Sequence, residues 1–104
     1  MQFDNVTVLA KANIYFEGKV VSHTVMTADG KRHTLGVILP GTSHFGTEAP
    51  ERMLVTAGAC QVMIDEQEET NSYVEGESFD VPGKSGFTIT VGESGCQYVC
   101  SFLS

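Results

Sequence analysis

Short apolar runs, rich in β-branched and aromatic residues, alternate along the chain with glycine-containing turns. Eleven of the 104 residues are glycine, and they recur at short intervals between positions 18 and 95. Short strands at regular spacing with turn signals between them are typical of an all-β sandwich or barrel. The predicted strands are Val20–Val25, His33–Leu39, Met53–Ala57, Gln61–Ile64, Ser78–Val81, Phe87–Val91 and Gln97–Phe102.

The turns and the lack of helical periodicity support this pattern. Asp29-Gly30 predicts the clearest hairpin turn, and Pro82-Gly83 predicts another reversal. No segment has apolar residues at helical spacing over three turns, so no long helix is expected. Residues 65–77 contain six of the thirteen acidic residues and no basic one, which predicts a solvated hairpin tip.

Length and charge narrow the possible functions. A chain of 104 residues fits one domain with one buried core. Six Lys and Arg against thirteen Asp and Glu give a net charge of −7, which argues against nucleic acid or an anionic membrane as a partner. No apolar run approaches the roughly 20 residues of a membrane span, and no secretory signal begins the chain. The expected location is the cytoplasm.

The three cysteines fit a reducing compartment. Cys60, Cys96 and Cys100 lie in apolar, strand-like runs, and their number is odd. A spacing of four along a strand puts Cys96 and Cys100 about 13 Å apart, which is too far for a disulfide. We therefore expect three buried, reduced thiols.

Two stretches resemble the paired sequence motifs of cupins, small double-sheet barrels of the jelly-roll type. Glu51 is followed by six residues and then Gly58, as in the first cupin motif. Gly76 is followed by five residues and then Pro82, as in the second. The resemblance implies an all-β, single-domain cupin, a double-stranded β-helix barrel, over residues 13–104. Residues 1–12 would be an N-terminal extension, either an added edge strand or a loose arm.

Other residues fill the positions at which cupins have metal-binding histidines. Phe45 and Thr47 replace the two histidines of the first motif, and Phe87 replaces the histidine of the second. A phenyl ring cannot bind a metal, so Glu51 would remain as a single ligand. His44 is one residue out of phase with Phe45, which on a strand turns it to the opposite face. No bound metal is therefore expected, and the barrel should enclose an aromatic pocket that suits a small planar ligand.

A wider set of residues resembles the pyrimidine/purine nucleoside phosphorylase family, formerly a domain of unknown function, whose members share the loss of the metal-binding histidines. The resemblance covers nearly the whole domain and departs from the family at Ala57, where relatives have serine. The matching segments are Tyr15-Phe16-Glu17-Gly18-Lys19-Val20, Gly36-Val37, residues 45–53, Ala57-Gly58, residues 79–83 and residues 98–103.

The resemblance implies a small cytosolic homodimer that cleaves the N-glycosidic bond of purine and pyrimidine nucleosides. Inorganic phosphate would be the co-substrate, the products would be a free base and (deoxy)ribose 1-phosphate, and no cofactor would be needed. Such a reaction needs a phosphate site, a platform for the base and a group that stabilises the cationic sugar. The candidates are Glu51 for catalysis, Phe45, Thr47, Met53, Phe87 and Tyr98 for substrate binding, and Arg52 and Lys19 for phosphate binding. Loose stacking in place of hydrogen bonds to the base edge would explain low base selectivity.

Plainer interpretations of the same residues remain open. The aromatic residues can belong to the core, Glu51 can pair with Arg52, and Arg52 and Lys19 can be surface cations. Two other functions are also open. One is a non-catalytic cupin module that binds a sugar or nucleotide-like small molecule, and the other is a metal-dependent cupin with His44, Glu48 and Glu51 as unusual ligands. Phosphate dependence tests the former, and elemental analysis tests the latter.

Overall fold

The structure, a computed structural model, describes residues 1–103, which are almost entirely strands and turns. The elements are β1 (Thr7–Val8), β2 (Asn13–Tyr15), the 3₁₀ turn η1 (Phe16–Gly18), β3 (Val20–Met26), β4 (Arg32–Ile38), β5 (Gly41–Thr47), β6 (Glu51–Ile64), β7 (Thr70–Val74), β8 (Ser78–Val81), β9 (Ser85–Val91) and β10 (Cys96–Phe102). The all-β prediction is confirmed.

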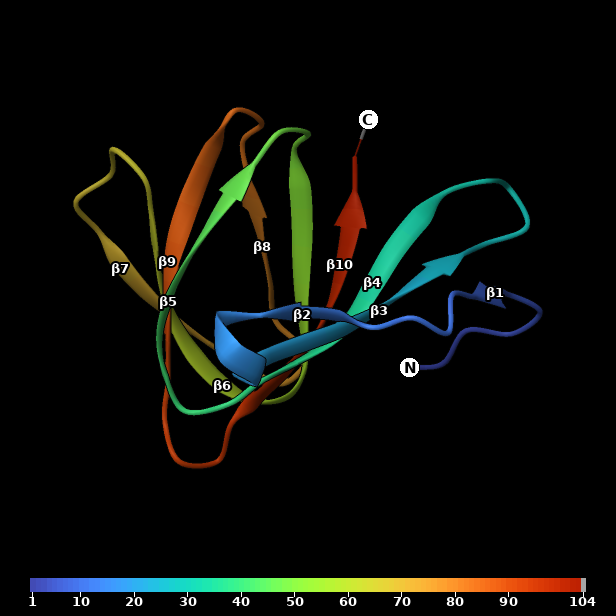
Figure 1. Cartoon of the computed structure of the whole chain (residues 1–104). Coiled ribbons are helices and arrows are strands. Elements are labelled where there is room, and N and C mark those ends of the chain that lie inside the picture. Colours follow the sequence, from blue (N-terminus) through green and yellow to red (C-terminus); the bar gives the residue numbers. More distant parts are fainter. Residues whose placement is uncertain (104) are drawn as a thin grey trace.

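The strands form one antiparallel sheet that curls into two facing halves, as Figure 1 shows. The order is β1-β3-β4-β10-β6-β9-β5, with β2 on β3 and with β7 and β8 on β6. The first half of β6 pairs with β10 and β8, and its second half pairs with β7 and β9. β6 thus belongs to both halves and joins them, in agreement with the predicted double-stranded β-helix.

Strand β6 is longer than the sequence pattern predicts. The runs Met53–Ala57 and Gln61–Ile64 are parts of one strand of 14 residues. Gly58 lies between them with a φ of +79°, a left-handed conformation that glycine adopts without steric cost. A bend at this residue lets one continuous strand pass from the first half of the sheet to the second.

The core occupies the space between the two halves. Its fully buried side chains include Phe87, Ile38, Ile89, Val20 and Val62, each at most 2% exposed. Burying one such side chain stabilises the fold by about 1.5–3 kcal/mol. All three cysteines are buried and free, as expected.

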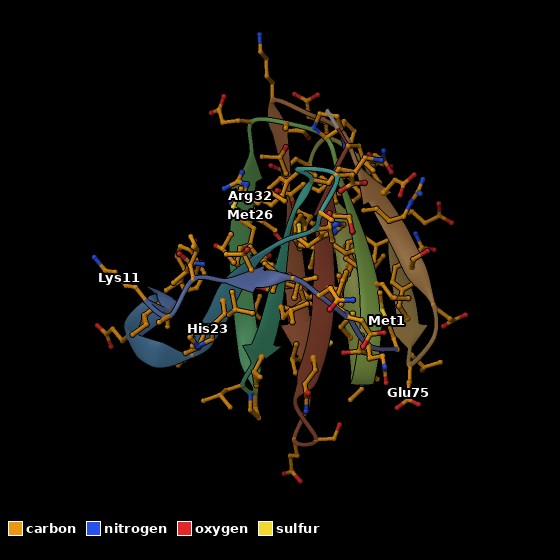
Figure 2. All side chains as sticks on the ribbon, turned by 90° about the vertical axis from the view of Figure 1, so that its right-hand side faces the viewer. Met1, Lys11, His23, Met26, Arg32 and Glu75 are labelled. Carbon is orange, nitrogen blue, oxygen red and sulfur yellow. The ribbon has the colours of Figure 1, made fainter. Side chains whose placement is uncertain are left out.

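The N-terminal segment crosses the outer face of β3, β4 and β10, as the path between the labelled Met1 and Lys11 shows in Figure 2. β1 pairs with β3 through Thr7 with Met26 and Val8 with Val25, and the Phe3 ring lies 5.3 Å from the His33 ring. Residues 1–12 therefore include a short edge strand.

Among residues 1–103, no helix is long and apolar enough to cross a membrane.

Candidate active site

A cavity of about 500 Å³ opens between the two halves of the sheet. It lies where the cross-strand pair Glu51 and Phe102 ends the pairing of β6 with β10. Its volume is in the range of about 300–1,000 Å³ that small-molecule sites occupy. The lining residues are Tyr15, Phe16, Ser22, Arg32, Thr34, His44, Phe45, Gly46, Glu48, Ala49, Glu51, Met53, Phe87, Tyr98, Cys100 and Phe102.

Stacked aromatic rings form one wall of the cavity. Phe45 on β5 and Phe87 on β9 are directly paired across the strands, and their rings lie 5.3 Å apart at an interplanar angle of 19°. Phe87 is only 1% exposed and supports Phe45, which is half-buried. Phe16 meets the Phe45 ring edge-on at 5.4 Å, from a turn in which residues 16–18 all have positive φ. A flat apolar surface of this kind can stack on a planar ligand.

Glu51 places a carboxylate in the same cavity. It begins β6, is half-buried, and pairs across the strands with Phe102. Burial raises the pKa of the Glu51 carboxyl, while a hydrogen bond from the Cys100 thiol and the charge of Arg32 act in the opposite direction. A half-buried carboxylate with one thiol donor keeps acceptor capacity for the hydroxyl groups of a ligand.

Cys100 and Tyr98 on β10 add two protonated groups beside Glu51. Burial raises the pKa of Cys100 to about 12, and the neighbouring Glu51 charge acts in the same direction. Burial also raises the pKa of Tyr98 to about 12, against a hydrogen bond with the Ser22 hydroxyl. Both groups therefore stay neutral near pH 7, so each can donate a hydrogen bond there.

Gly36 makes room for the Tyr98 ring. The two residues are paired across β4 and β10, and a Cβ at position 36 would overlap the Tyr98 ring. Without this glycine, the ring could not lie against β4 with its hydroxyl at Ser22 on β3. The position of Tyr98 thus depends on a residue that has no side chain.

Arg32 is a cavity residue that the sequence interpretation missed. It begins β4, and its guanidinium carbon lies 4.1 Å from the centroid of the Phe102 ring. The signal that could have found it is the alternation Arg32, Thr34, Gly36, because residues two apart on a strand share a face. Gly36 and Thr34 pair with Tyr98 and Cys100 on the cavity side of the sheet.

The structure brings five of the eight predicted site residues together: Phe45, Glu51, Met53, Phe87 and Tyr98 line the cavity. Thr47 is buried beside it, where its hydroxyl donates to the Pro82 carbonyl at 2.6 Å and accepts from the Ser85 amide at 3.1 Å. These two bonds hold the β5 and β9 ends together and leave Thr47 with a structural role here.

The two predicted phosphate ligands lie outside the cavity. Arg52 projects from the opposite face of β6 and forms two hydrogen bonds to Asp80, of 2.8 and 3.1 Å. Lys19 follows η1 and is exposed, and it does not line the cavity. Arg52 is adjacent to Glu51 in the sequence, but neighbours on a strand point to opposite faces.

The cupin histidine positions provide no metal centre. Phe45 and Phe87 at two of them stack on each other, and His44 pairs with Asp65 at 2.9 Å instead. Among residues 1–103, no group of three or more His, Cys, Asp and Glu side chains is arranged to hold a metal ion. The ligand set His44, Glu48 and Glu51 is therefore not assembled.

Comparison with solved structures supports the cupin fold. A protein of unknown function from Acinetobacter sp. ADP1 has a TM-score of 0.95 and 46% identity, with 98% of each chain covered. Oxalate decarboxylase from Bacillus subtilis, a protein with Mn(II) centres, has a TM-score of 0.74 at 15% identity, over 93% of this chain and 28% of the other. The second likeness shows a shared fold alone.

Comparison with sequences is more specific. Residues 10–102 match the family model described as pyrimidine/purine nucleoside phosphorylase. Proteins of that name from Burkholderia orbicola (strain MC0-3) and Paraburkholderia xenovorans (strain LB400) are 59% and 54% identical over 102 residues, which is 98% of this chain and 95% of each relative. The match spans both cupin motifs and the residues that line the cavity, so the chain belongs to the pyrimidine/purine nucleoside phosphorylase family.

Proposed function

We propose that this protein is a broad-specificity nucleoside phosphorylase, a pentosyltransferase. It cleaves purine and pyrimidine nucleosides with inorganic phosphate to give a free base and (deoxy)ribose 1-phosphate. Family membership supports the reaction class. The observation that favours it in the structure is one cavity with a stacked aromatic wall and a half-buried carboxylate, Glu51.

In this reaction the aromatic wall would bind the base, and Glu51 would act on the sugar. A phosphate oxygen forms a bond to the anomeric carbon of the sugar while the bond from that carbon to the base nitrogen breaks. The base nitrogen takes the electron pair of the broken bond and a proton, which hydrogen phosphate can supply. Positive charge develops on the sugar in between, and the Glu51 carboxylate is placed to stabilise it and to accept hydrogen bonds from the ribose hydroxyls.

The aromatic wall favours broad base selectivity. Phe45, supported by Phe87, offers a surface on which any purine or pyrimidine ring can stack. Met53 and Tyr98 complete the apolar lining beneath it. Stacking does not distinguish the hydrogen-bonding edges of bases, so low selectivity follows from this arrangement.

The experiment that tests this proposal measures release of uracil from uridine and hypoxanthine from inosine, with and without inorganic phosphate. We expect release that depends on phosphate. Glu51→Gln should lower kcat by about 10²–10³-fold, because it removes a charge that acts on the transition state. Glu93→Gln, in the exposed β9–β10 turn, is the matched control and should leave kcat unchanged. Absence of release from either nucleoside would favour a ligand-binding cupin module instead.

We also propose that catalysis needs no metal ion or cofactor. The supporting observation is that phenylalanine fills two of the three histidine positions of the cupin motifs. Activity should survive dialysis against a chelator. Loss of activity that a transition metal then restores would contradict this.

A homodimer that works in the cytoplasm is the final part of the proposal. Buried, free thiols fit a reducing compartment. In the described part of the chain, β2 pairs with β3 alone, so one of its edges is open, and its Ile14 is 65% exposed. An open edge of this kind invites pairing with a second copy about a two-fold axis. A monomeric mass at micromolar concentration would contradict the dimer.

A further inference from the structure

Arg32 is the basic residue of the cavity. Of the six Lys and Arg side chains, all within residues 1–103, it alone lines the cavity that contains Glu51. Figure 2 shows it beside Met26, its partner across β3 and β4, at the end of the β3–β4 hairpin. It also borders a neighbouring surface hollow together with Phe102, so it lies at the mouth of the cavity, where a solute enters.

The guanidinium of Arg32 is positioned but not neutralised. It lies over the Phe102 ring at 4.1 Å, a cation–π contact that fixes its place and uses none of its five N–H donors. Among residues 1–103, Arg32 forms no salt bridge and no side-chain hydrogen bond. The two ion pairs in this part of the chain join His44 to Asp65 and Arg52 to Asp80. Arg32 thus keeps the planar fork of donors that fits a phosphate.

The distance between Arg32 and Glu51 follows from the register. Phe102 on β10 pairs with Glu51 on β6. On its other side, β10 pairs with β4, where Ser101 lies opposite His33. Continuing this pairing by one residue puts Phe102 opposite Arg32. The three residues therefore form one row across β4, β10 and β6. Neighbouring strands lie about 4.8 Å apart, so the Arg32 and Glu51 backbones are about 9–10 Å apart with the Phe102 ring between them.

We infer that Arg32 binds the phosphate co-substrate, on the far side of Phe102 from Glu51. This rests on the proposed function. The row leaves room for a sugar held at Glu51 and a phosphate held at Arg32, side by side above the Phe102 ring. Phosphate carries negative charge into a cavity that already contains a carboxylate, and Arg32 is the group that offsets this repulsion. Arg52 and Lys19 have no part in this site.

The test compares Arg32→Gln with Arg52→Gln as a matched control that removes one arginine charge outside the cavity. At saturating nucleoside, Arg32→Gln should raise KM for phosphate about 10–100-fold, as expected for loss of a charged hydrogen-bonding group. KM for nucleoside should change much less. Arg32→Lys keeps the charge but loses the paired donors, so its KM for phosphate should be intermediate. Arg52→Gln should match the wild type.

A phosphate KM in Arg32→Gln within about twofold of the wild-type value overturns the inference, since even one charged hydrogen bond is worth more. Calorimetric titration with inorganic phosphate tests the site without turnover. If the wild type releases no base but binds phosphate in an Arg32-dependent way, the proposed function fails and the anion site stands. If uridine 5′-monophosphate binds through Arg32 and inorganic phosphate does not, the assignment to a free co-substrate is wrong.

Discussion

Tyr98 shows how much a single side chain in this cavity depends on its neighbour. The ring occupies space that Gly36 leaves open on β4, and its hydroxyl meets Ser22 on β3. A methyl group at position 36 would force the ring away from β4 and into the cavity. The shape of the cavity is therefore set by the absence of one Cβ.

Gly36→Ala is expected to lower the free energy of unfolding by about 1–3 kcal/mol, as overpacking of a core does. It should also raise KM for nucleoside, because the displaced Tyr98 ring narrows the cavity. Urea unfolding and nucleoside kinetics measure the two effects. Gly92→Ala is the control, because a Cβ there meets nothing within 4 Å. Wild-type stability in Gly36→Ala would contradict this account of Tyr98.

The raised pKa of Glu51 makes stability depend on pH in a known direction. Its carboxyl has an ordinary pKa of 4.5, and burial raises that value in the folded state. The folded protein thus binds this proton more tightly than the unfolded chain does. The stability that Glu51 contributes is fully present below pH 4.5 and is lost as the pH rises through the raised value.

Glu51→Gln removes this dependence and should therefore gain stability over the wild type as the pH rises from 4 to 7. Thermal unfolding across that range, with Glu93→Gln beside it to correct for the loss of one negative charge, measures the difference. If the Tm of Glu51→Gln instead falls relative to that of the wild type as the pH rises, Glu51 is not held in a partly desolvated site.

The sequence predicted those site residues that a motif fixes by spacing. Glu51, Phe45 and Phe87 follow from the cupin motifs and line the cavity. Its adjacency to Glu51 makes Arg52 a candidate in the sequence, yet strand alternation turns Arg52 to the opposite face of β6, where it pairs with Asp80. The alternation Arg32, Thr34, Gly36 puts Arg32 on one face of β4, but the pairing of β4 with β10 is needed to show that this face lines the cavity.

At the scale of elements, apolar strands were predicted and polar strands were missed. Six of the seven predicted runs lie wholly within strands, and the seventh, His33–Leu39, passes the end of β4 at Ile38 by one residue. β5 begins with the polar residues Gly41–His44, and β7 lies in the acidic stretch assigned to a hairpin tip. Both strands lie at the margins of their half of the sheet, β7 on β6 and β5 on β9, where polar residues face solvent. β5 and β7 form strands because they pair with β9 and β6 in the folded barrel, and their own sequence pattern does not predict this.

Gly58 is the residue at which β6 bends and passes from the first half of the sheet to the second. Its φ of +79° disfavours any residue with a Cβ, and a Cβ there would also overlap the Gly95 carbonyl group. Gly58→Ala should therefore lower the free energy of unfolding by at least about 2 kcal/mol. Urea unfolding checks this, again with Gly92→Ala as the control. A loss no larger than the control's would mean that the strand can bend elsewhere.

At the scale of the whole molecule, the sequence motifs predicted the barrel correctly because they mark its turns and inward positions. The division into a cupin domain over residues 13–104 and an extension over residues 1–12 stays a prediction. β1 adds to the edge of β3, and the first residues lie over the outer face of the sheet. The position of this segment comes from packing, since its own pattern predicts no strand.

The continuity of β6 determines where the chain can be interrupted. Residues 51–58 and 59–64 hold different partners, so neither half of the barrel has a full set of strands without the other. Unfolding should therefore be a single transition, with circular dichroism and tyrosine fluorescence curves that coincide. Cleavage in the exposed turn at residues 66–69 should leave the two fragments associated and active, whereas separate synthesis of residues 1–58 and 59–104 should give no folded piece. The folded chain should therefore tolerate a cut in this turn, but the barrel should not split into two parts that fold independently.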